Sequence, residues 1–421
     1  MIREFFNISD NLMKTDGEVL ALCAERFAEI ENIKQYNQLK MLKAFTDCGV
    51  AANHLVGTTG YGYDDIGREK LENVFACLTG SEDALFRHNF MSGTHTITVA
   101  LFGILRPGDD MMCVTGTPYD TLCSVIGIGD KGENYGSLKD FGVKYSQVNL
   151  LGDGTPDYDA IAKNAPGKKM CYIQRSRGYA DRPSITLEQI EKISAAAKTA
   201  NPDICVVVDN CYGEFTQKSE PTQHGADLII GSLIKNPGGA IAPTGGYIAG
   251  KKRLVELCAH RLTAPGTGRE IGCTNDMLRQ LYLGLYFAPG VTAEALKTAV
   301  YASCLCENLG FKTAPRYTQP RNDIVTSIYT KNADQLCALC RGIQAASPVD
   351  SFVTPEPWPM PGYDSDVIMA AGAFTMGSSI ELSCDAPMRS PYIAYMQGGI
   401  NFASGRAGVL LAAQNLLDIN A

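Results

Sequence analysis

The chain has 421 residues, which is long enough for two or three domains at roughly 150 residues each. Hydrophobic residues make up 45% of it and charged residues 19%, a balance that is typical of globular proteins and excludes a disordered chain. The formal net charge of -8 argues against a protein that binds nucleic acid through broad attraction to phosphates.

Helical spacing of apolar residues covers the first 45 residues and predicts an N-terminal helical arm. A loop rich in glycine and tyrosine follows at 51–68, and a helix is expected at 69–78. Beyond it, short apolar runs that predict strands alternate with helical patterns. The predicted strands are 84–90, 111–115, 169–174, 204–209, 227–230 and 246–249, and the helices between them include 94–105, 186–200 and 253–257.

The pattern changes after about residue 290. A long helix at 292–309 precedes predicted strands at 323–329, 367–374 and 379–383, with helices at 334–346 and 405–417. Near-continuous apolar strands separated by helices are typical of a mostly parallel sheet that is covered on both faces. We therefore expect an α/β protein with three parts, which are the arm at 1–45, a large domain at 46–290 that contains this sheet and a small α+β domain at 291–421.

Cysteine usage indicates a reducing compartment. The 15 cysteines are scattered singly, many of them inside apolar runs where a free thiol packs as a small hydrophobic group. The CxxC spacing of Cys337 and Cys340 lies in a helix-like stretch without a second pair, so we expect no metal there. Residues 1–14 lack the apolar core of a signal peptide, and no apolar window is long enough to span a membrane. We expect a cytoplasmic protein without a membrane partner.

Polar residues gather where predicted strands end, and ligands of doubly wound sheets bind outside the carboxyl ends of the strands. Ser92, Gly93 and Thr94 stand between a strand and a helix, so that N–H groups of the helix N-terminus could hold a phosphate dianion. Serine and threonine are also common helix caps, and this motif alone favours the cap.

Two further strand ends carry a carboxylate and a lysine. Asp209 ends an apolar run at the edge of the sheet, where it could be a cofactor partner, a helix cap or a metal ligand. Lys235 follows another apolar run and precedes the sequence NPGG, and a lysine that is desolvated there can lose its proton and form a Schiff base. Ser232, three residues before Lys235, would add a hydroxyl to a phosphate site.

Together, these three elements indicate pyridoxal 5'-phosphate. This cofactor needs a phosphate cradle, an imine-forming lysine and a carboxylate that keeps its pyridine nitrogen protonated. The order in the chain, from the cradle to Asp209 and then to Lys235, is that of the fold-type I pyridoxal phosphate enzymes. Each motif is weak by itself, whereas the ordered set is specific.

The chain resembles the methionine gamma-lyase-like family, also called aluminium resistance proteins, which are relatives of the cystathionine beta- and gamma-lyases. The stretches that carry this resemblance are spread over nearly the whole chain. They are GYGYDDIGREKLE (60–72), SGTHTITVALFGILRPGDD (92–110), YIQRSRGYADRPS (172–184), VDNCYGEF (208–215), GSLIKNPGGAIAPTGGYIAG (231–250) and MPGYDSDVIMAAGAF (360–374). The resemblance implies a fold-type I aminotransferase-like protomer with a mostly parallel, seven-stranded sheet. It also implies a homodimer or homotetramer with active sites at the subunit interface.

The resemblance further implies roles for residues of the cofactor site. Lys235 would carry the cofactor and move the α-proton of an amino-acid substrate, and Asp209 would pair with the pyridinium. The phosphate would be held by Ser92, Gly93, Thr94 and Ser232.

Other roles concern the ring, the partner subunit and the substrate. Tyr119 resembles the tyrosine that stacks on the cofactor ring and belongs to the catalytic set, although a core tyrosine near a turn is an equal alternative. Tyr61 and Tyr63 resemble the loop tyrosine that relatives donate to the phosphate of the neighbouring subunit. Arg389 is a candidate for binding the α-carboxylate of the substrate. Arg68 also matches the pattern of the relatives, but a solvated arginine at a helix start is the simpler account.

The chain departs from the classical lyases around residues 174–177 and 232–239. Arg175 and Arg177 could face the cofactor or an anionic substrate, or could form loop ion pairs. His95 could stack on the ring or be an ordinary helix residue. These departures leave the cofactor chemistry intact and the substrate open.

We expect a carbon-sulfur lyase that acts on methionine, cystathionine or cysteine by β- or γ-elimination. An aminotransferase, a racemase or an aldolase on the same fold is the alternative within the enzymes, because fold does not fix the reaction. A protein that retains the cofactor without catalysis is the alternative outside them.

Overall fold

The computed structural model describes residues 2–129, 135–360 and 365–419, so that part of the stretch 360–374 lies outside the described residues. The chain forms two compact units. The large unit contains residues 39–233 and 241–286, and the small unit contains residues 1–38, 234–240 and 287–421. The predicted domain limits at residues 45 and 290 stay a prediction.

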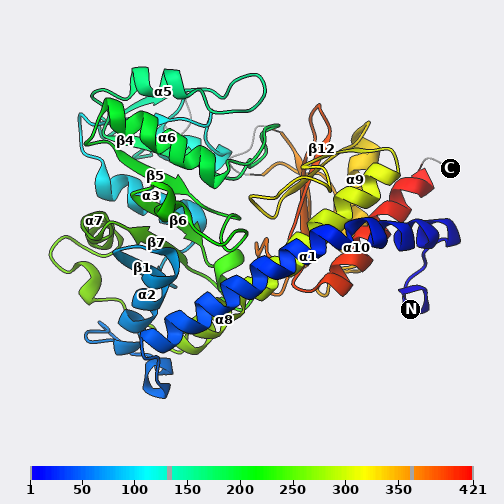
Figure 1. The fold of residues 1–421 in the computed structure, drawn as a ribbon, viewed down its shortest axis with the longest axis horizontal. Coiled ribbons are helices and arrows are strands. Elements are labelled where there is room, and N and C mark those ends of the chain that lie inside the picture. Colours follow the sequence, from blue (N-terminus) through cyan, green and yellow to red (C-terminus); the bar gives the residue numbers. More distant parts are fainter. Residues whose placement is uncertain (1, 130–134, 361–364, 420–421) are drawn as a thin grey trace. The chain divides into compact units, whose positions relative to one another are not determined.

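The large unit is built on a seven-stranded sheet in the order β1-β7-β6-β5-β4-β2-β3 (Figure 1). Its strands are β1 (Asp83–Arg87), β2 (Asp110–Cys113), β3 (Lys144–Gln147), β4 (Met170–Gln174), β5 (Cys205–Asp209), β6 (Leu228–Ser232) and β7 (Gly246–Gly250). Neighbouring strands pair in parallel except at β7, which runs antiparallel to both β6 and β1. The predicted fold class, a mostly parallel seven-stranded sheet, is confirmed.

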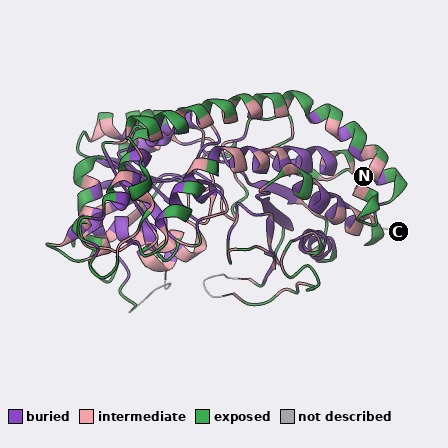
Figure 2. Ribbon diagram, turned by 90° about the horizontal axis from the view of Figure 1, so that it is seen from below, coloured by how far each residue is buried: buried purple, intermediate pink, exposed green. Residues whose placement is uncertain are grey.

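Helices cover both faces of this sheet. They are α2 (Ile66–Thr79), α3 (Gly93–Ile104), α4 (Asp120–Ile126), α5 (Tyr158–Asn164), α6 (Leu187–Ala200) and α7 (Lys252–Leu262), together with the 3-10 turns η2 (Ala52–Leu55), η3 (Pro221–His224) and η5 (Gly268–Glu270). Side chains alternate along a strand, so Leu85 of β1 joins a core cluster with Ile97 of α3 and Val255 of α7. Its neighbour Phe86 instead contacts Phe75 of α2, with 4.9 Å between ring centroids. Burial on both faces explains the continuous apolar runs, and Figure 2 shows the contrast between buried strands and exposed outer helix faces.

The small unit contains a five-stranded antiparallel sheet in the order β10-β11-β12-β9-β8. Its elements are η1 (Ile2–Glu4), η4 (Asn236–Gly238), β8 (Lys312–Ala314), β9 (Thr326–Tyr329), α9 (Ala333–Ala345), β10 (Val367–Ala370), β11 (Ser383–Pro387), β12 (Ile393–Gln397) and α10 (Phe402–Ile419), and the long helices α1 (Asp10–Asp47) and α8 (Leu278–Asn308) belong to it in part. Asp16 of α1 accepts hydrogen bonds from Tyr301 Oη of α8 and Arg406 Nε of α10, both at 2.7 Å. This buried carboxylate therefore joins three helices of the unit.

Two predicted elements differ from the structure. The strand expected at 379–383 is wrong, because the chain is irregular up to residue 382 and β11 begins at Ser383. The Glu381 carboxylate accepts the backbone N–H groups of Phe374 at 2.8 Å and Thr375 at 3.1 Å, so residue 381 closes a turn instead of joining a ladder. The helix expected from residue 292 already begins at Leu278 and includes Pro289.

The cysteines are free thiols, and most of them are buried. Burial raises the pKa of Cys171 and of Cys205 to about 12, so that these thiols stay protonated and pack as apolar groups. Within the described ranges, no helix has both the length and the apolarity that a membrane crossing requires.

Candidate active site

The N-terminus of α3 provides two N–H groups that can bind an anion. Ser92 is the N-cap residue, and its Oγ accepts the N–H of His95 at 3.1 Å. The N–H groups of Gly93 and Thr94 have no backbone acceptor among the described residues, as is usual in the first turn of a helix. The side chain of Thr94 is held by Thr121, with 3.0 Å between the two hydroxyl oxygens. This end of α3 therefore suits a negatively charged ligand.

Ser232, the last residue of β6, lies against this helix start. A Cβ on Gly93 would stand 3.4 Å from Ser232 Cβ and 3.9 Å from Cys211 Sγ. Ser232 is 1% exposed, and its Oγ has no hydrogen-bond partner among the described residues. A buried hydroxyl without a partner costs about 1–3 kcal/mol. The unpaired hydroxyl beside two unpaired amides fits a group with several acceptor oxygens, such as a phosphate.

Asp209 ends β5 at the same edge of the sheet. It is 8% exposed, and its Oδ1 accepts the N–H of Cys211 at 3.1 Å. In the sheet register it stands beside Gln174 of β4 and Ile230 of β6. Burial raises the pKa of the Tyr172 phenol well above its usual range, and the nearby charge of Asp209 adds to this effect. β5 therefore ends in a buried carboxylate, which is a group that can interact with a cationic atom of a ligand.

Tyr119 precedes α4 and is fixed by the last residue of β4 and by the segment that follows this strand. Its backbone N–H donates to Gln174 Oε1 at 2.7 Å. Its ring lies 5.7 Å from that of Tyr179, edge to face, and a Cβ on Gly178 would stand 2.9 Å from the Tyr119 ring. Gly178 has a φ of +56°, so both its backbone and this contact require glycine. The half-buried ring thus has a defined position.

Gln174 is a site residue that sequence reasoning did not identify. Its amide oxygen accepts from Tyr119, its Nε2 donates to the Ser176 carbonyl at 3.1 Å, and its backbone N–H donates to Thr115 Oγ1 at 3.1 Å. It also stands beside Asp209 in the ladder. The signal in the sequence is a polar residue that ends the apolar run 170–173, the same signal that identified Asp209.

Lys235 follows Ser232 by three residues and precedes the 3-10 turn η4. It is half-buried, and its carbonyl accepts the N–H of Gly238 at 3.3 Å. The chain before it is fixed by β6, and the N–H of Leu233 donates to the Gly245 carbonyl at 2.9 Å. The backbone that leads to Lys235 is therefore fixed where it leaves β6.

Tyr61 and Tyr63 lie on an ordered loop with 73% and 57% of their surface exposed. Their rings stack on one another at 5.7 Å between centroids. Neither side chain hydrogen-bonds to Gly93, Thr94 or Ser232 within the described part of the chain. The structure therefore does not join these two tyrosines to the helix-start site.

Arg68 holds this loop through hydrogen bonds, and the expectation that it is exposed to solvent is wrong. The residue is 1% exposed. Its Nη1 donates to the carbonyls of Gly62 at 2.9 Å and Gly272 at 2.6 Å, and its Nη2 donates to that of Glu270 at 3.3 Å. Three carbonyl acceptors compensate the burial of the guanidinium.

The remaining arginines differ in their surroundings. Arg389 is exposed between β11 and β12 of the small unit. Arg175 is fully buried and donates to Asn210 Oδ1 at 2.7 Å and to the Gly213 carbonyl at 3.0 Å, so it braces the turn that follows Asp209. Arg177 is 2% exposed.

His95 is an ordinary helix residue in its contacts. Its Nδ1 accepts the backbone N–H of Met91 at 3.1 Å, and burial lowers its pKa. Both effects keep the imidazole neutral, and they tie the ring to the chain that enters α3.

The chain is similar to known proteins over nearly its whole length. The sequence model of the methionine gamma-lyase family matches residues 12–417. An uncharacterized protein of Bacillus subtilis (strain 168), YnbB, is 46% identical over 407 residues, which is 96% of each chain.

Solved structures are also similar to the chain over nearly its whole length. The carbon-sulfur lyase involved in aluminum resistance from Clostridium novyi NT has a TM-score of 0.93 and 47% identity, and the match covers 97% of this chain and 96% of that one. The pyridoxal-5'-phosphate dependent protein YhfS from Escherichia coli has a TM-score of 0.62 at 15% identity, covering 92% and 97%. At that identity the likeness concerns the fold, which is that of the fold-type I enzymes.

Proposed function

The chain belongs to the methionine gamma-lyase family, and on this premise we propose that it is a pyridoxal-phosphate-dependent lyase that cleaves a carbon-sulfur bond of an amino acid. The observation that carries the proposal is the buried, unpaired hydroxyl of Ser232 against the start of α3. This hydroxyl could donate a hydrogen bond to a phosphate at the same edge of the sheet at which Asp209 ends β5.

The phosphate would be held by this chain without a cationic side chain. The N–H groups of Gly93 and Thr94 point out of the positive end of α3, and Ser232 Oγ can donate a further hydrogen bond. Ser92 keeps the first turn of the helix in place through its bond to the His95 N–H. A Cβ at position 93 would fill part of the space that the phosphate needs.

When bound, pyridoxal phosphate supplies an electron sink that stabilises negative charge at the α-carbon of an amino acid. Asp209 would keep a proton on the pyridine nitrogen through its carboxylate charge. Lys235 would hold the cofactor through its Nζ, and the same Nζ would move the α-proton of the substrate. Tyr119, whose backbone N–H donates to Gln174 Oε1 at 2.7 Å, would lie against the ring.

The substrate would be methionine, cystathionine or cysteine, with Arg389 as the partner of its α-carboxylate. Loss of sulfur from the β-carbon needs removal of one proton, whereas loss from the γ-carbon needs a second proton abstraction, for which a tyrosine such as Tyr119 can serve. The exposed pair Tyr61 and Tyr63 would reach the phosphate of a partner subunit in a homodimer or homotetramer. Free, mostly buried thiols suit a cytoplasmic protein.

The test is an assay of the purified, cofactor-loaded protein with each of the three amino acids. A lyase releases ammonia, a 2-oxo acid and a thiol, or hydrogen sulfide when cysteine is the substrate, in equal amounts. An aminotransferase releases neither thiol nor ammonia and needs a 2-oxo acid as acceptor, a racemase changes only optical rotation, and a protein without catalysis gives no product. The Lys235→Ala variant should lose both the visible absorbance and the activity, and Lys163→Ala, an exposed lysine of α5, is the matched control.

A further inference from the structure

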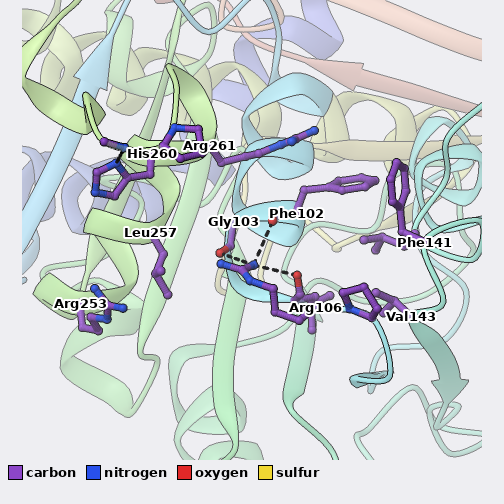
Figure 3. A pocket seen from close by; sticks show the side chains of 14 residues that line it. Phe102, Gly103, Arg106, Phe141, Val143, Arg253, Leu257, His260 and Arg261 are labelled. Carbon is purple, nitrogen blue, oxygen red and sulfur yellow. Dashed lines mark hydrogen bonds between the residues drawn. The ribbon is translucent and has the colours of Figure 1, made fainter.

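A hollow opens in the large unit, at the end of α3 opposite Gly93 (Figure 3). Its volume is about 630 Å³, which is in the range of sites for small organic ligands. It is formed by the last turn of α3, by α7 and by the segment around Phe141. Because α3 has 12 residues, the hollow lies about 18 Å from Gly93 along the helix axis. It is therefore separate from the candidate active site.

The lining combines positive charge with apolar surface. Arg106, Arg253, His260 and Arg261 contribute cationic or hydrogen-donating groups, and no aspartate or glutamate belongs to the described residues that line the hollow. This contrasts with the formal charge of -8 of the whole chain. A concave surface with one sign of charge raises the local concentration of ions of the opposite sign.

Arg261 is the cation with the most freedom to bind a ligand. Its guanidinium carbon lies 5.1 Å from the centre of the Phe102 ring, and Figure 3 shows its side chain extending toward that ring. In the described part of the chain, no carboxylate lies within ion-pair distance of it. The guanidinium is thus held over an aromatic face while its N–H groups remain available.

Arg106 caps the C-terminus of α3 with only part of its guanidinium group. Its Nη1 donates to the carbonyls of Phe102 at 3.3 Å, Gly103 at 2.9 Å and Leu105 at 2.9 Å, which caps the C-terminus of α3. Its Nη2 has no acceptor among the described residues. The nearby carboxylate of Asp109 accepts the backbone N–H of Arg106 at 2.7 Å and does not engage the guanidinium.

The two other polar groups come from α7. Arg253 pairs with Glu256 at 2.8 Å on the exposed side of the helix. His260 Nδ1 accepts the N–H of Gly266 at 3.3 Å, so in the neutral ring the proton is on Nε2, which can donate to an anion. Arg106 thus has a role in the fold as the cap of α3. Arg261 contacts the Phe102 ring and caps no helix end among the described residues.

Phe102, Leu257, Phe141 and Val143 supply the apolar surface of the hollow (Figure 3). We propose that it binds a small organic anion in which a ring-sized apolar body carries a carboxylate, phosphate or sulfonate group. The acidic group would meet Arg261, and the body would pack on Phe102 and Leu257.

The probe for this site is 8-anilinonaphthalene-1-sulfonate, which joins two aromatic groups to one sulfonate. Titrated into the cofactor-loaded protein, it should bind with one molecule per chain and leave the cofactor absorbance unchanged. N-phenyl-1-naphthylamine has the same rings without the sulfonate, and we expect it to bind at least about tenfold more weakly, since charged hydrogen bonds are lost. Absence of saturable binding, or equal affinity for the two dyes, would overturn the proposal.

Variants locate the binding. The Arg261→Gln variant should raise the Kd for the sulfonate about tenfold or more. Leu257→Trp keeps all charges but fills the hollow, and should abolish the one-to-one binding. Arg316→Gln, which removes an exposed arginine of the small unit, should leave the Kd unchanged. If Arg261→Gln and Leu257→Trp both bind as the wild type does, the dye binds elsewhere and the proposal fails.

Discussion

The Cβ of Ser232 lies 3.4 Å from the point where a Cβ on Gly93 would stand. These two residues are far apart in the sequence, and each belongs to a motif that is ordinary by itself. Their contact turns a helix start and a strand end into one surface with two unpaired amides and one unpaired hydroxyl. It is this contact that separates an anion site from a simple helix cap.

Replacing Ser232 by alanine should have opposite effects on stability and on cofactor affinity. Because the hydroxyl is buried without a partner, its removal should leave the free energy of unfolding of the apo protein unchanged or raise it by up to about 1 kcal/mol. The Kd for pyridoxal phosphate should rise about tenfold, because one hydrogen bond to the phosphate is lost. Urea unfolding and absorbance titration measure the two quantities.

Ser303→Ala is the matched control for this prediction. Ser303 Oγ donates to the Pro315 carbonyl at 3.0 Å and accepts from Arg321 Nη2 at 2.6 Å. Its loss should destabilise the protein by about 1–3 kcal/mol and should not change cofactor affinity. If Ser232→Ala destabilises the apo protein as much as Ser303→Ala does, its hydroxyl is serving the fold.

Asp209→Asn should lower kcat by at least about a hundredfold, because the charge that keeps the pyridine nitrogen protonated is removed. An asparagine oxygen can still accept the N–H of Cys211, now at 3.1 Å, so circular dichroism should not change. Asp203→Asn, in the exposed turn before β5, should behave as the wild type. A kcat within about threefold of the wild type would show that Asp209 does not act on the cofactor.

Arg68→Gln should destabilise the protein by about 3 kcal/mol, since it removes charged hydrogen bonds from a buried guanidinium to the carbonyls of Gly62 and Gly272. The loop with Tyr61 and Tyr63 should then be cut by protease at lower concentrations than in the wild type. Urea unfolding and limited proteolysis test both effects. Unchanged proteolysis with lowered stability would mean that the loop is held by its other contacts.

Acid should destabilise the protein in part through His95. Burial holds the pKa of His95 below its ordinary value, so the unfolded chain binds more protons than the native one when the pH falls below about 6.5. Stability should be full above this pH and decline toward the lower pKa of the folded state. His95→Gln should flatten the plot of unfolding free energy against pH in this range.

His88 provides the comparison for this pH dependence. Burial and the neighbouring Arg87 also lower its pKa, so the His88→Gln, His95→Gln double variant should be flatter than either single variant. An unchanged slope in the double variant would mean that other groups cause the acid sensitivity.

Much of the fold could be predicted because the buried strands of the sheet are apolar on both faces. β3 (Lys144–Gln147) was not predicted, because it is an edge strand without a fully buried position. Asp209 and Gln174 both end apolar runs, but only the carboxylate has an obvious chemical role. The contacts of Arg68 with Gly272 and of Gly93 with Ser232 join distant parts of the chain, and local patterns carry no information on them.

The reversed direction of β7 has a consequence for the segment that bears Lys235. A parallel strand after β6 would require the chain to leave the carboxyl edge and cross the sheet. Because β7 is antiparallel, with Ser232 beside Gly246 in the ladder, the connection 233–245 begins and ends at that one edge. Lys235 is the third residue after Ser232, so its Cα stays within about 11 Å of the Ser232 Cα in any conformation of the connection. The covalent link to β6 therefore restricts Lys235 to the region near the carboxyl edge of the sheet.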